Sequence, residues 1–539
     1  MIHTENLTLS YGGTTLFEDV NVKFVPGNCY GLIGANGAGK STFLKILSGD
    51  IDPSSGAVRI EPNKRIAVLK QNQFEYDAYP VLDTVLMGHA ALYQIYAELE
   101  SIYAKADMTD ADGLRAGELT EQYGELDGYT AEANAAKFLS ELGIVESLHK
   151  KTMGELESGQ KVRVLLAQAL FGDPDILLLD EPTNQLDYHS VLHLENFLMN
   201  FENTVIVISH NRHFLNKVCT HIADLDFKQI RTYVGNYDFW EKASQLAAKQ
   251  RKDQNKKNEE KIKELEDFVR RFSANASKSK QATSRKKLIE KLRPEDMPTS
   301  SRQSPFIQIK PKRACGGDVL TVSKLSHSIQ GERVLSNVSF TMHKGDKIGL
   351  VGQNSLSKTT LLEILAGNIV PDSGVVAWGS TVSPGYFPKD NSTFFDGNMS
   401  LIDWLGQYDT NNNDIQYIRG LLGRMLFSGD AVLKPTKVLS GGEKARAMFS
   451  KLMITEANTL LLDEPTDHLD LESISALNDG LIAYPEPLIV ASHDFELLNT
   501  VVNRVMEVTP NGFFIQDTGF DDYMQSVEIQ ERRKRVLGE

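Results

Sequence analysis

Uninterrupted runs of apolar residues recur along the chain, each followed by a turn and a stretch with helical spacing. The runs at 29–33, 176–179 and 205–208 contain no charged residue, which is typical of parallel strands buried on both faces of a sheet. Residues 43–47 begin a segment with helical periodicity directly after such a strand and a turn. This alternation predicts an α/β fold with a largely parallel sheet, whose ligand lies at the carboxyl ends of the strands.

The same order of patterns occurs twice along the chain. Lys40 has its counterpart at Lys358, an offset of 318, whereas Asp180 has its counterpart at Asp463, an offset of 283. The chain is therefore an internal duplication. Because the two offsets differ by 35, the first copy carries 35 additional residues between its early and its late motifs.

The duplication divides the chain into two domains, which we expect at 1–240 and 314–539, joined by a linker at 241–313. The additional residues of the first copy lie at about 88–124, where Tyr, Leu and Ile recur at helical spacing. They predict a helical arm inserted into the first domain. A helical decoration that contacts no partner is the alternative for this arm.

The predicted linker differs in composition from both domains. Residues 239–272 are rich in Lys and Glu and contain no glycine or proline, so they predict one helix of about 50 Å. A small-polar and basic tip follows at 273–287, and a second helix should return to about Leu292. Residues 271–293 hold eight basic side chains and one acidic side chain, Glu290. This charge fits a probe that reaches toward nucleic acid, and a solvated linker is the alternative.

Composition limits the class of protein. The chain has 539 residues, of which 41% are apolar and 24% charged, as in soluble globular proteins. Its cysteines, Cys29, Cys219 and Cys315, form no Cys-x-x-Cys motif, which argues against a disulfide framework or a zinc site and favours a reducing cytoplasm. No apolar run approaches the roughly 18 residues that cross a membrane. The net charge is −15, yet 241–313 hold 21 Lys and Arg against 10 Asp and Glu, which suggests a local contact with a polyanion.

The motif with the most specific chemistry is Gly34-Ala35-Asn36-Gly37-Ala38-Gly39-Lys40-Ser41-Thr42, between a predicted strand and a predicted helix. Its spacing is that of a phosphate-binding loop, in which backbone N–H groups and the positive end of the helix hold phosphate. Lys40 would reach the β- and γ-phosphates of a nucleotide, and Ser41 would ligate Mg²⁺. A glycine-rich turn without a ligand is the alternative, which the agreement of spacing and context disfavours.

Further motifs occur in both copies. Leu156-Glu157-Ser158-Gly159-Gln160 and Leu439-Ser440-Gly441-Gly442-Glu443 precede predicted helices. We call them the first and the second signature. Each is followed by an apolar strand ending in Asp-Glu-Pro-Thr, and then by Leu-Asp and Ser-His. Together with the phosphate loop, these motifs resemble ABC-type ATPase domains over nearly the whole chain. Two such domains joined by a basic helical linker resemble the ABC-F family of ribosome-associated ATPases, and residues 271–279 are most similar to its bacterial YbiT-like branch.

The resemblance implies that the two domains close face to face on two ATP molecules. Each nucleotide would lie between the loop of one domain and the signature of the other, with carboxylates and histidines acting on Mg²⁺, water and the γ-phosphate. The implied catalytic residues are Glu181, His210, Gln71, Glu464 and His493, and the implied Mg²⁺ ligands are Ser41, Gln71, Asp180, Thr359 and Asp463. The implied nucleotide contacts are Tyr11, which would stack on adenine, and Gly34, Asn36, Gly37, Gly39, Lys40, Ser41, Thr42, Ser440, Gly441, Gly442, Gly352, Lys358, Thr359, Ser158 and Gly159.

Five departures from the family pattern fall on one side of this arrangement. They put side chains where backbone should approach phosphate, and a carboxylate where the γ-phosphate should lie. The replacements are Ser355 for Gly37, Ser357 for Gly39, Lys389 for Gln71 and Ile329 for Tyr11 at the 318 offset, and Glu157 for the signature serine. All five lie in the site made by the second loop and the first signature, so we infer one competent and one degenerate site. Whether the degenerate site still binds nucleotide stays open, as does the effect of Gln185 and Asp467, which replace a histidine and an asparagine of the family.

The resemblance further implies a cytoplasmic, monomeric ATPase whose closed form docks on the ribosome. The basic segment at 271–293 would face rRNA and peptidyl-tRNA, and no membrane would be involved. An ATPase subunit of a transporter is the first alternative, disfavoured by the tandem fusion and the charged linker. A nucleotide-gated scaffold with little hydrolysis is the second, disfavoured by Glu181 and the intact first site.

Overall fold

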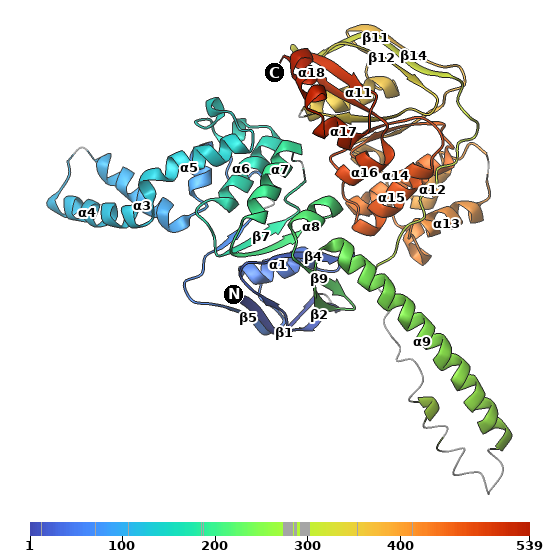
Figure 1. Ribbon diagram of the computed structural model, residues 1–539, viewed down its shortest axis with the longest axis horizontal. Helices are drawn as coiled ribbons and strands as arrows, with labels where there is room; N and C mark the ends of the chain where they lie inside the picture. The colour runs from blue at the N-terminus through green and yellow to red at the C-terminus, as the bar shows by residue number, and fades with distance from the viewer. Residues whose placement is uncertain are drawn as a thin grey trace.

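A computed structural model describes the chain except residues 12, 70, 71, 106, 185, 187, 273–283, 285–287, 291–301, 353, 412 and 539. Within the described part, two α/β domains lie side by side, which confirms the predicted fold class (Figure 1). Gln71, Gln185 and most of the predicted linker tip and return helix lie outside the described residues.

The first domain is built on a six-stranded sheet with the order β10-β9-β4-β8-β7-β6. Every neighbouring pair is parallel except β9 and β10. In β7, Ile176 and Leu178 pack into one core cluster while Leu177 and Leu179 pack into another on the opposite face, as predicted for a strand buried on both sides. The strands are β4 (Cys29–Gly34), β6 (Ile66–Val68), β7 (Ile176–Asp180), β8 (Thr204–Ile208), β9 (His221–Asp226) and β10 (Gln229–Val234).

A small antiparallel sheet covers one face of this main sheet. It comprises β1 (Ile2–Tyr11), β2 (Thr14–Val20), β3 (Lys23–Phe24) and β5 (Ser55–Ile60). Helix α1 (Lys40–Ser48) shares one core cluster with residues of both sheets, because Phe43 and Leu47 belong to the same cluster as Phe17 and Ile206. The phosphate loop, which joins β4 to α1, is therefore held at the carboxyl end of the main sheet.

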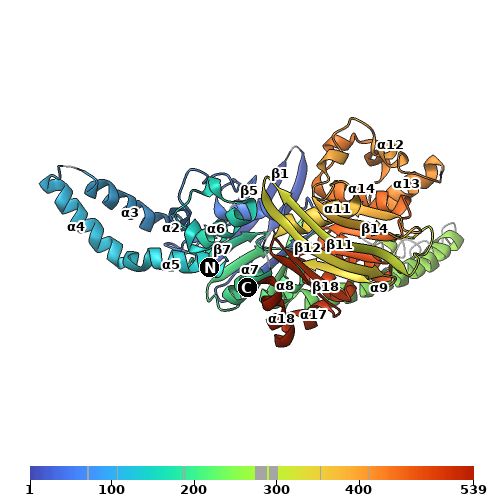
Figure 2. The ribbon, with the colours of Figure 1, turned by 90° about the horizontal axis from the view of Figure 1, so that it is seen from above.

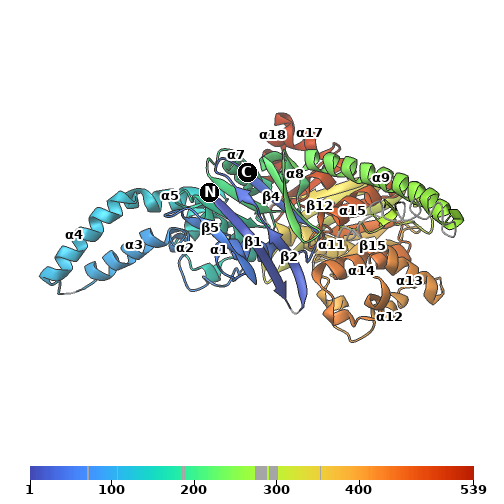
Figure 3. The ribbon, with the colours of Figure 1, turned by 90° about the horizontal axis from the view of Figure 1, so that it is seen from below.

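Helices cover the other face of the first domain. The helices of the first domain after α1 are α2 (Val81–Leu86), α3 (Ala90–Tyr103), α4 (Asp110–Glu125), α5 (Gly128–Glu141), α6 (Ser158–Leu170), α7 (Tyr188–Met199) and α8 (Arg212–Val218), and all but the arm formed by α3 and α4 lie near the sheet (Figure 1). α3 and α4 form an arm that points away from both domains (Figures 1 and 3). The arm has its own small core of Leu99, Ile102, Ala116 and Leu119. Its two helices occupy the segment in which we expected the insertion.

The second domain repeats this architecture, with the sheet orders β15-β16-β17-β13-β18-β19 and β12-β11-β14. The strands are β11 (Asp318–Ile329), β12 (Glu332–His343), β13 (Lys347–Val351), β14 (Ser373–Trp378), β15 (Pro384–Phe387), β16 (Thr459–Asp463), β17 (Leu488–Ala491), β18 (Arg504–Thr509) and β19 (Gly512–Gln516). The helices are α11 (Ser355–Ala366), α12 (Leu401–Gly406), α13 (Ile415–Arg424), α14 (Gly441–Ile454), α15 (Leu471–Ala483), α16 (Phe495–Val501), α17 (Phe520–Gln525) and α18 (Val527–Leu537). The repeat read in the sequence is thus a structural duplication.

The linker begins with α9 (Tyr237–Phe272), a single helix of 36 residues. It leaves the domains on the side opposite the arm (Figure 2). Its base is anchored in the first domain, because Tyr237 and Trp240 belong to that domain's core. Near the end of the segment expected as linker, Ile307 and Ile309 pack into the core of the second domain. No helix in the described part of the chain is both long enough and apolar enough to cross a membrane.

Candidate nucleotide site

The first phosphate loop, residues 34–42, leaves β4 and enters α1 through two glycines in the left-handed region. Gly37 has φ 79° and Gly39 has φ 101°, and a side chain at either position would be strained. Gly39 is the N-cap of α1, so the helix begins at Lys40 itself. The Lys40 ammonium donates to the carbonyl oxygens of Gly34, at 2.7 Å, and Ala35, at 3.2 Å, which fixes the lysine across its own loop.

Asp180 and Glu181 stand at the carboxyl end of β7, next to this loop. Asp180 accepts a hydrogen bond from the Ser41 hydroxyl. Glu181 has φ 51°, a strained conformation that recurs at its counterpart Glu464 with φ 46°. Hydroxyl and carboxylate oxygens are the ligands that Mg²⁺ prefers, so the chemistry of Ser41 and Asp180 fits this ion beside a phosphate group.

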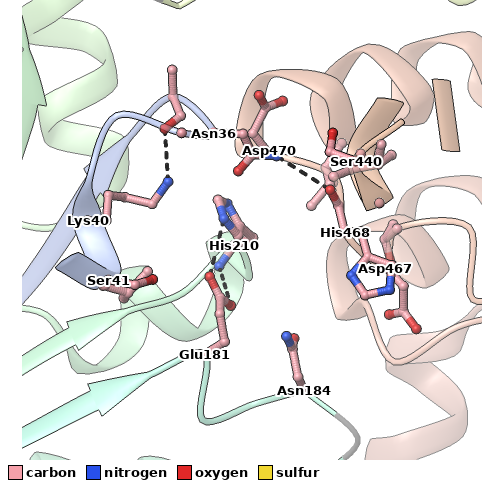
Figure 4. A pocket seen from close by; sticks show the side chains of 18 of the residues that line it. Asn36, Lys40, Ser41, Glu181, Asn184, His210, Ser440, Asp467, His468 and Asp470 are labelled. Atoms are coloured by element: carbon pink, nitrogen blue, oxygen red, sulfur yellow. Dashed lines mark hydrogen bonds and ion pairs between the residues drawn. The ribbon is translucent and has the colours of Figure 1, made fainter. Parts of the chain in front are cut away.

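Glu181 and His210 form a pair at the floor of the site (Figure 4). The backbone N–H of His210 donates to Glu181 Oε2 at 3.2 Å, and His210 Nε2 lies 3.2 Å from Glu181 Oε1. Burial, with the adjacent charge of Asp180, raises the pKa of Glu181 to about 7. Burial, with the charge of Lys40, lowers the pKa of His210 to about 3, so the imidazole is neutral at pH 7. A carboxylate that titrates near neutral pH suits a general base.

The second domain supplies the opposite wall of this site. A cavity of about 810 Å³ is lined by the first loop, Glu181 and His210 on one side, and by Ser440, Gly441 and Gly442 on the other. Ser440 caps α14, and its hydroxyl accepts from the Glu443 N–H at 3.3 Å. A direct contact joins the two walls, because the Asn36 side-chain amide donates to the His468 carbonyl at 3.4 Å (Figure 4).

Some expected residues do not line this cavity, and some lining residues were not expected. Tyr11, expected to stack on adenine, is 55% exposed and is not part of the lining. Residues that the sequence did not indicate as ligands are Asn184, Gln303, Arg446, Asp467, His468 and Asp470. The position of 467–470 after the second Asp-Glu-Pro-Thr motif was a usable signal, whereas nothing in the sequence pointed to Gln303.

The second loop, residues 352–360, has a different conformation. Helix α11 begins at Ser355, three residues before Lys358, whereas α1 begins at its lysine. The side chain of Asn354 caps this longer helix by accepting from the Ser357 N–H at 2.9 Å. Serine disfavours the left-handed conformation that the first loop requires, so the segment continues as helix. The concave turn of the first loop is thus replaced by a helical turn.

Side chains of the second loop bond within their own domain. The Ser357 hydroxyl donates to the Val334 carbonyl at 2.8 Å in a fully buried position. Lys358 lies 3.5 Å from Glu464. The Thr359 hydroxyl donates to Asp463 at 2.7 Å. The threonine bond repeats that of Ser41 to Asp180 in the first domain, whereas the pairing of the lysine with a buried glutamate is particular to the second loop.

The charges around Glu464 differ from those around Glu181. Burial alone would raise the pKa of Glu464, but the facing His493 and the charges of Lys358 and Lys389 outweigh it and lower that pKa. Lys389, which replaces the expected glutamine, donates to the Ser355 hydroxyl at 2.8 Å. Glu464 is thus held as a carboxylate by cations of its own domain.

The first signature is capped like the second one. Glu157 is the N-cap of α6, the position that Ser440 holds in α14, and its N–H donates to Gln160 Oε1 at 3.2 Å. A cavity of about 80 Å³ lies beside the second loop. Among the described residues that line it, the first domain contributes residues of 186–213 and none of 157–160. Among the described residues, the first loop and the second signature thus line one cavity together, whereas the first signature does not line the cavity beside the second loop.

Comparisons with known proteins cover the whole chain. A family model described as ABC transporter matches residues 17–184 and 335–467, and another with the same description matches 223–309. The uncharacterized ABC transporter ATP-binding protein YkpA of Bacillus subtilis is 55% identical, and the match covers 100% of both chains. The probable ATP-binding protein YbiT of Escherichia coli O157:H7 is 45% identical, over 98% of this chain and 100% of that protein. The ABC transporter F family member 2 of Arabidopsis thaliana is 31% identical, and the match covers 99% of this chain and 80% of that protein.

Solved structures match at the level of the fold. A complex of the archaeal ribosomal stalk protein aP1 and the archaeal ribosome recycling factor aABCE1 contains a chain that aligns with a TM-score of 0.62 at 18% identity, over 98% of both chains. A structure described as a model of ribosome-bound archaeal Pelota and ABCE1 aligns with a TM-score of 0.55 at 18% identity, over 99% of this chain and 80% of that chain. Both alignments include the two halves of this chain, so these structures share the tandem arrangement of the domains as well as the fold of each domain.

Proposed function

This chain belongs to the ABC-F family of tandem ABC-type ATPases, in its YbiT-like branch, and we propose that ATP-driven closure of its two domains operates it on the ribosome. It binds and hydrolyses ATP, as its ABC ATPase domains do throughout the family. The observation that carries the closure mechanism is the single cavity lined by the first loop and the second signature.

The residues of this cavity suit the recognition of a nucleoside triphosphate from two sides. Backbone N–H groups at the start of α1 and the Lys40 ammonium hold the phosphates from the first domain. The start of α14 at Ser440 faces the same cavity from the second domain. A γ-phosphate would therefore join the domains, and its loss would separate them. Mg²⁺, held by Ser41 and Asp180, would neutralise charge on the phosphates.

The hydrolytic step needs a group that orients or deprotonates water. Glu181 is that group in our proposal, because it lies in the cavity with a pKa raised to about 7. The neutral imidazole of His210 lines the same cavity beside Glu181, and its one N–H can be donated either to Glu181 or to the γ-phosphate. The Lys40 side chain at the loop is placed to stabilise the negative charge that develops on the phosphates.

We assign the second loop and the first signature to a degenerate site. Its helical turn lacks the left-handed glycines of the first loop, and its lysine is paired with Glu464. Gly352, Lys358, Thr359, Ser158 and Gly159 are the residues with which it would hold any nucleotide that it still binds. This assignment accounts for a molecule that closes around one working site.

The proposal that the ribosome is the partner is supported by the family and by the charge of the linker. The solved structures with the same fold are described as a ribosome recycling factor and as a ribosome-bound complex. The basic segment at 271–293, which follows the linker helix in the sequence, would contact rRNA and tRNA. We propose a cytoplasmic monomer. A transporter subunit is disfavoured, because the linker has no use in that role.

Co-sedimentation with ribosomes tests the proposal. Glu181→Gln should bind ribosomes with ATP and not with ADP, and the binding should weaken as salt rises. The matched control is Lys40→Ala in the same background, which should lose the dependence on ATP. Reversing the charges of Lys278, Lys280, Arg285, Lys286 and Lys287 should reduce the salt slope. Equal binding with either nucleotide, or none with both, would overturn the proposed function.

A further inference from the structure

Arg302 joins the two domains and the linker at one point. Its guanidinium donates to Asp224 of β9 at 2.5 Å and to Glu472 of α15 at 2.6 Å. The same group lies 4.6 Å from the ring centroid of Trp240, at the base of α9. The Arg302 side chain is 12% exposed, so these ion pairs are largely shielded from water. One side chain thus contacts the first domain, the linker helix and the second domain.

The second domain contains the duplicate of this cluster in a different form. Glu507 corresponds to Asp224 at the 283 offset, and its partner is Arg533 of α18, at 2.6 and 2.7 Å. Both of these bonds lie inside the second domain. The duplicate therefore shows that a carboxylate at this strand position can be paired locally. Asp224 of the first domain is instead paired with Arg302, a residue between the two domains in the sequence, which divides its bonds between Asp224 and Glu472 of the second domain.

The Arg302 bridge lies next to the first nucleotide site. Gln303, the following residue, lines the cavity, as does Asp470, which is the N-cap of α15. Glu472 belongs to the first turn of the same helix. The partner of Arg302 in the second domain is thus carried by the helix whose start forms part of the cavity wall.

A second arginine, Arg212, ties the same elements together. It lies two residues after His210, and its guanidinium donates to Glu241 of α9 at 2.7 Å and to Ser475 of α15 at 3.3 Å. It also pairs with Glu496 of α16 at 3.4 Å. The base of the linker helix is therefore held between the domains by two arginines, each of which contacts α15.

We infer that Arg302 is a positioning residue that couples the orientation of the linker helix to closure at the first nucleotide site. This inference rests on the proposed function and names the contact through which the linker acts on it. Closure brings Glu472 on α15 toward Asp224 on β9, so Arg302 holds both carboxylates only when the domains are close. Because α9 is one helix of 36 residues, about 54 Å long, a small rotation at its base displaces its far end widely.

The test measures closure directly by the distance between two spin labels. Met199 at the end of α7 and Ile482 in α15 are exposed and lie in different domains, while Cys29, Cys219 and Cys315 are buried. Both labelled positions are changed to cysteine in the Glu181→Gln protein. The ATP concentration for half-closure is then measured for Arg302→Gln, Glu472→Gln and the double variant.

We expect each single variant to raise the half-closure concentration at least about fivefold, and the double variant to raise it no further. In the protein with Glu181 intact, the ATP concentration for half-maximal hydrolysis should rise while kcat is retained. The matched control is Arg504→Gln, since Arg504 bridges Asp346 and Asp517 at 2.6 Å each inside the second domain. It should close like the parent.

Two results would overturn the inference. One is closure of both single variants at the parent's ATP concentration, and the other is an additive effect in the double variant. Glu472→Gln leaves the Arg302–Asp224 pair in place, so the test stands even if Arg302→Gln fails to fold. If the labelled parent itself does not close with ATP, the proposed function fails instead, which separates the two failures.

Discussion

Lys358 and Glu464 form an ion pair at 3.5 Å in which each side chain is only 2% exposed. In the first domain the lysine is arranged differently, because Lys40 donates to backbone carbonyls of its own loop, while Glu181 keeps the histidine contact that Glu464 also makes. The same two residue types thus serve an open site in one domain and a closed ion pair in the other. We interpret the second pair as structural.

This interpretation predicts different losses for two lysine variants. Lys358→Ala leaves Glu464 buried without its nearest ammonium, so it should destabilise the second domain by about 3 kcal/mol while ATP binding persists. Lys40→Ala should abolish tight ATP binding and change the melting temperature little. Thermal denaturation measures the stability of the two variants, and titration with a fluorescent ATP analogue measures their ATP binding. Loss of ATP binding by Lys358→Ala at unchanged melting temperature would show a working second site.

Restoring the two glycines of the second loop should allow ATP to bind there only if the residues at positions 389 and 157 are also changed to those expected from the family. Ser355→Gly with Ser357→Gly removes the buried bond to Val334, which costs about 1 kcal/mol, and allows the turn to form. Lys389 and Glu157 would still oppose nucleotide. Adding Lys389→Gln and Glu157→Ser should raise the number of bound ATP molecules from one to two per chain in equilibrium dialysis. Two bound ATP molecules in the unaltered protein would contradict this account.

A buried carboxylate at the domain interface predicts a pH dependence of stability. Glu195 of α7 pairs with His213 at 3.3 Å and Lys217 at 3.0 Å, and His213 stacks on Phe495 of the second domain. Burial alone would raise the pKa of Glu195, but these two partners outweigh it and lower the pKa below 4.5. A carboxylate whose pKa is lower in the folded state stabilises it above pH 4.5, and this stabilisation is lost as the pH falls through the folded pKa.

Glu195→Gln should therefore melt below the parent protein at pH 7, and the difference should shrink as the pH falls below 4.5. The control is Glu118→Gln on the arm, because the Glu118 side chain is 66% exposed and its ion pair with Arg115 lies at the surface. This control should match the parent at every pH. A difference in melting temperature that does not change with pH would contradict the assignment of Glu195.

The strands and the first loop were predictable because their signals are local. Apolar runs such as 176–179 fix a strand buried on both faces, and the glycine spacing around Lys40 fixes the turn. The loss of Gly37 and Gly39 in the second copy was equally visible. The earlier start of α11 could not be predicted from this loss, because it depends on capping by Asn354.

The contacts of Arg302 could not be predicted from the sequence. Its two carboxylate partners are 78 and 170 positions away along the chain, so only the tertiary structure brings them together. The same holds for Asn36 and His468, which are 432 positions apart. The interface between duplicated domains is thus the part of the site that local patterns do not describe.

The most direct test of a single working site compares the two catalytic carboxylates in the ribosome-free protein. Steady-state ATP hydrolysis is measured for Glu181→Gln and Glu464→Gln at saturating ATP. The account predicts that Glu181→Gln lowers kcat by at least about 100-fold, because it removes the general base, and that Glu464→Gln retains most of the activity. Equal losses in the two variants would contradict it, because both composite sites would then hydrolyse ATP.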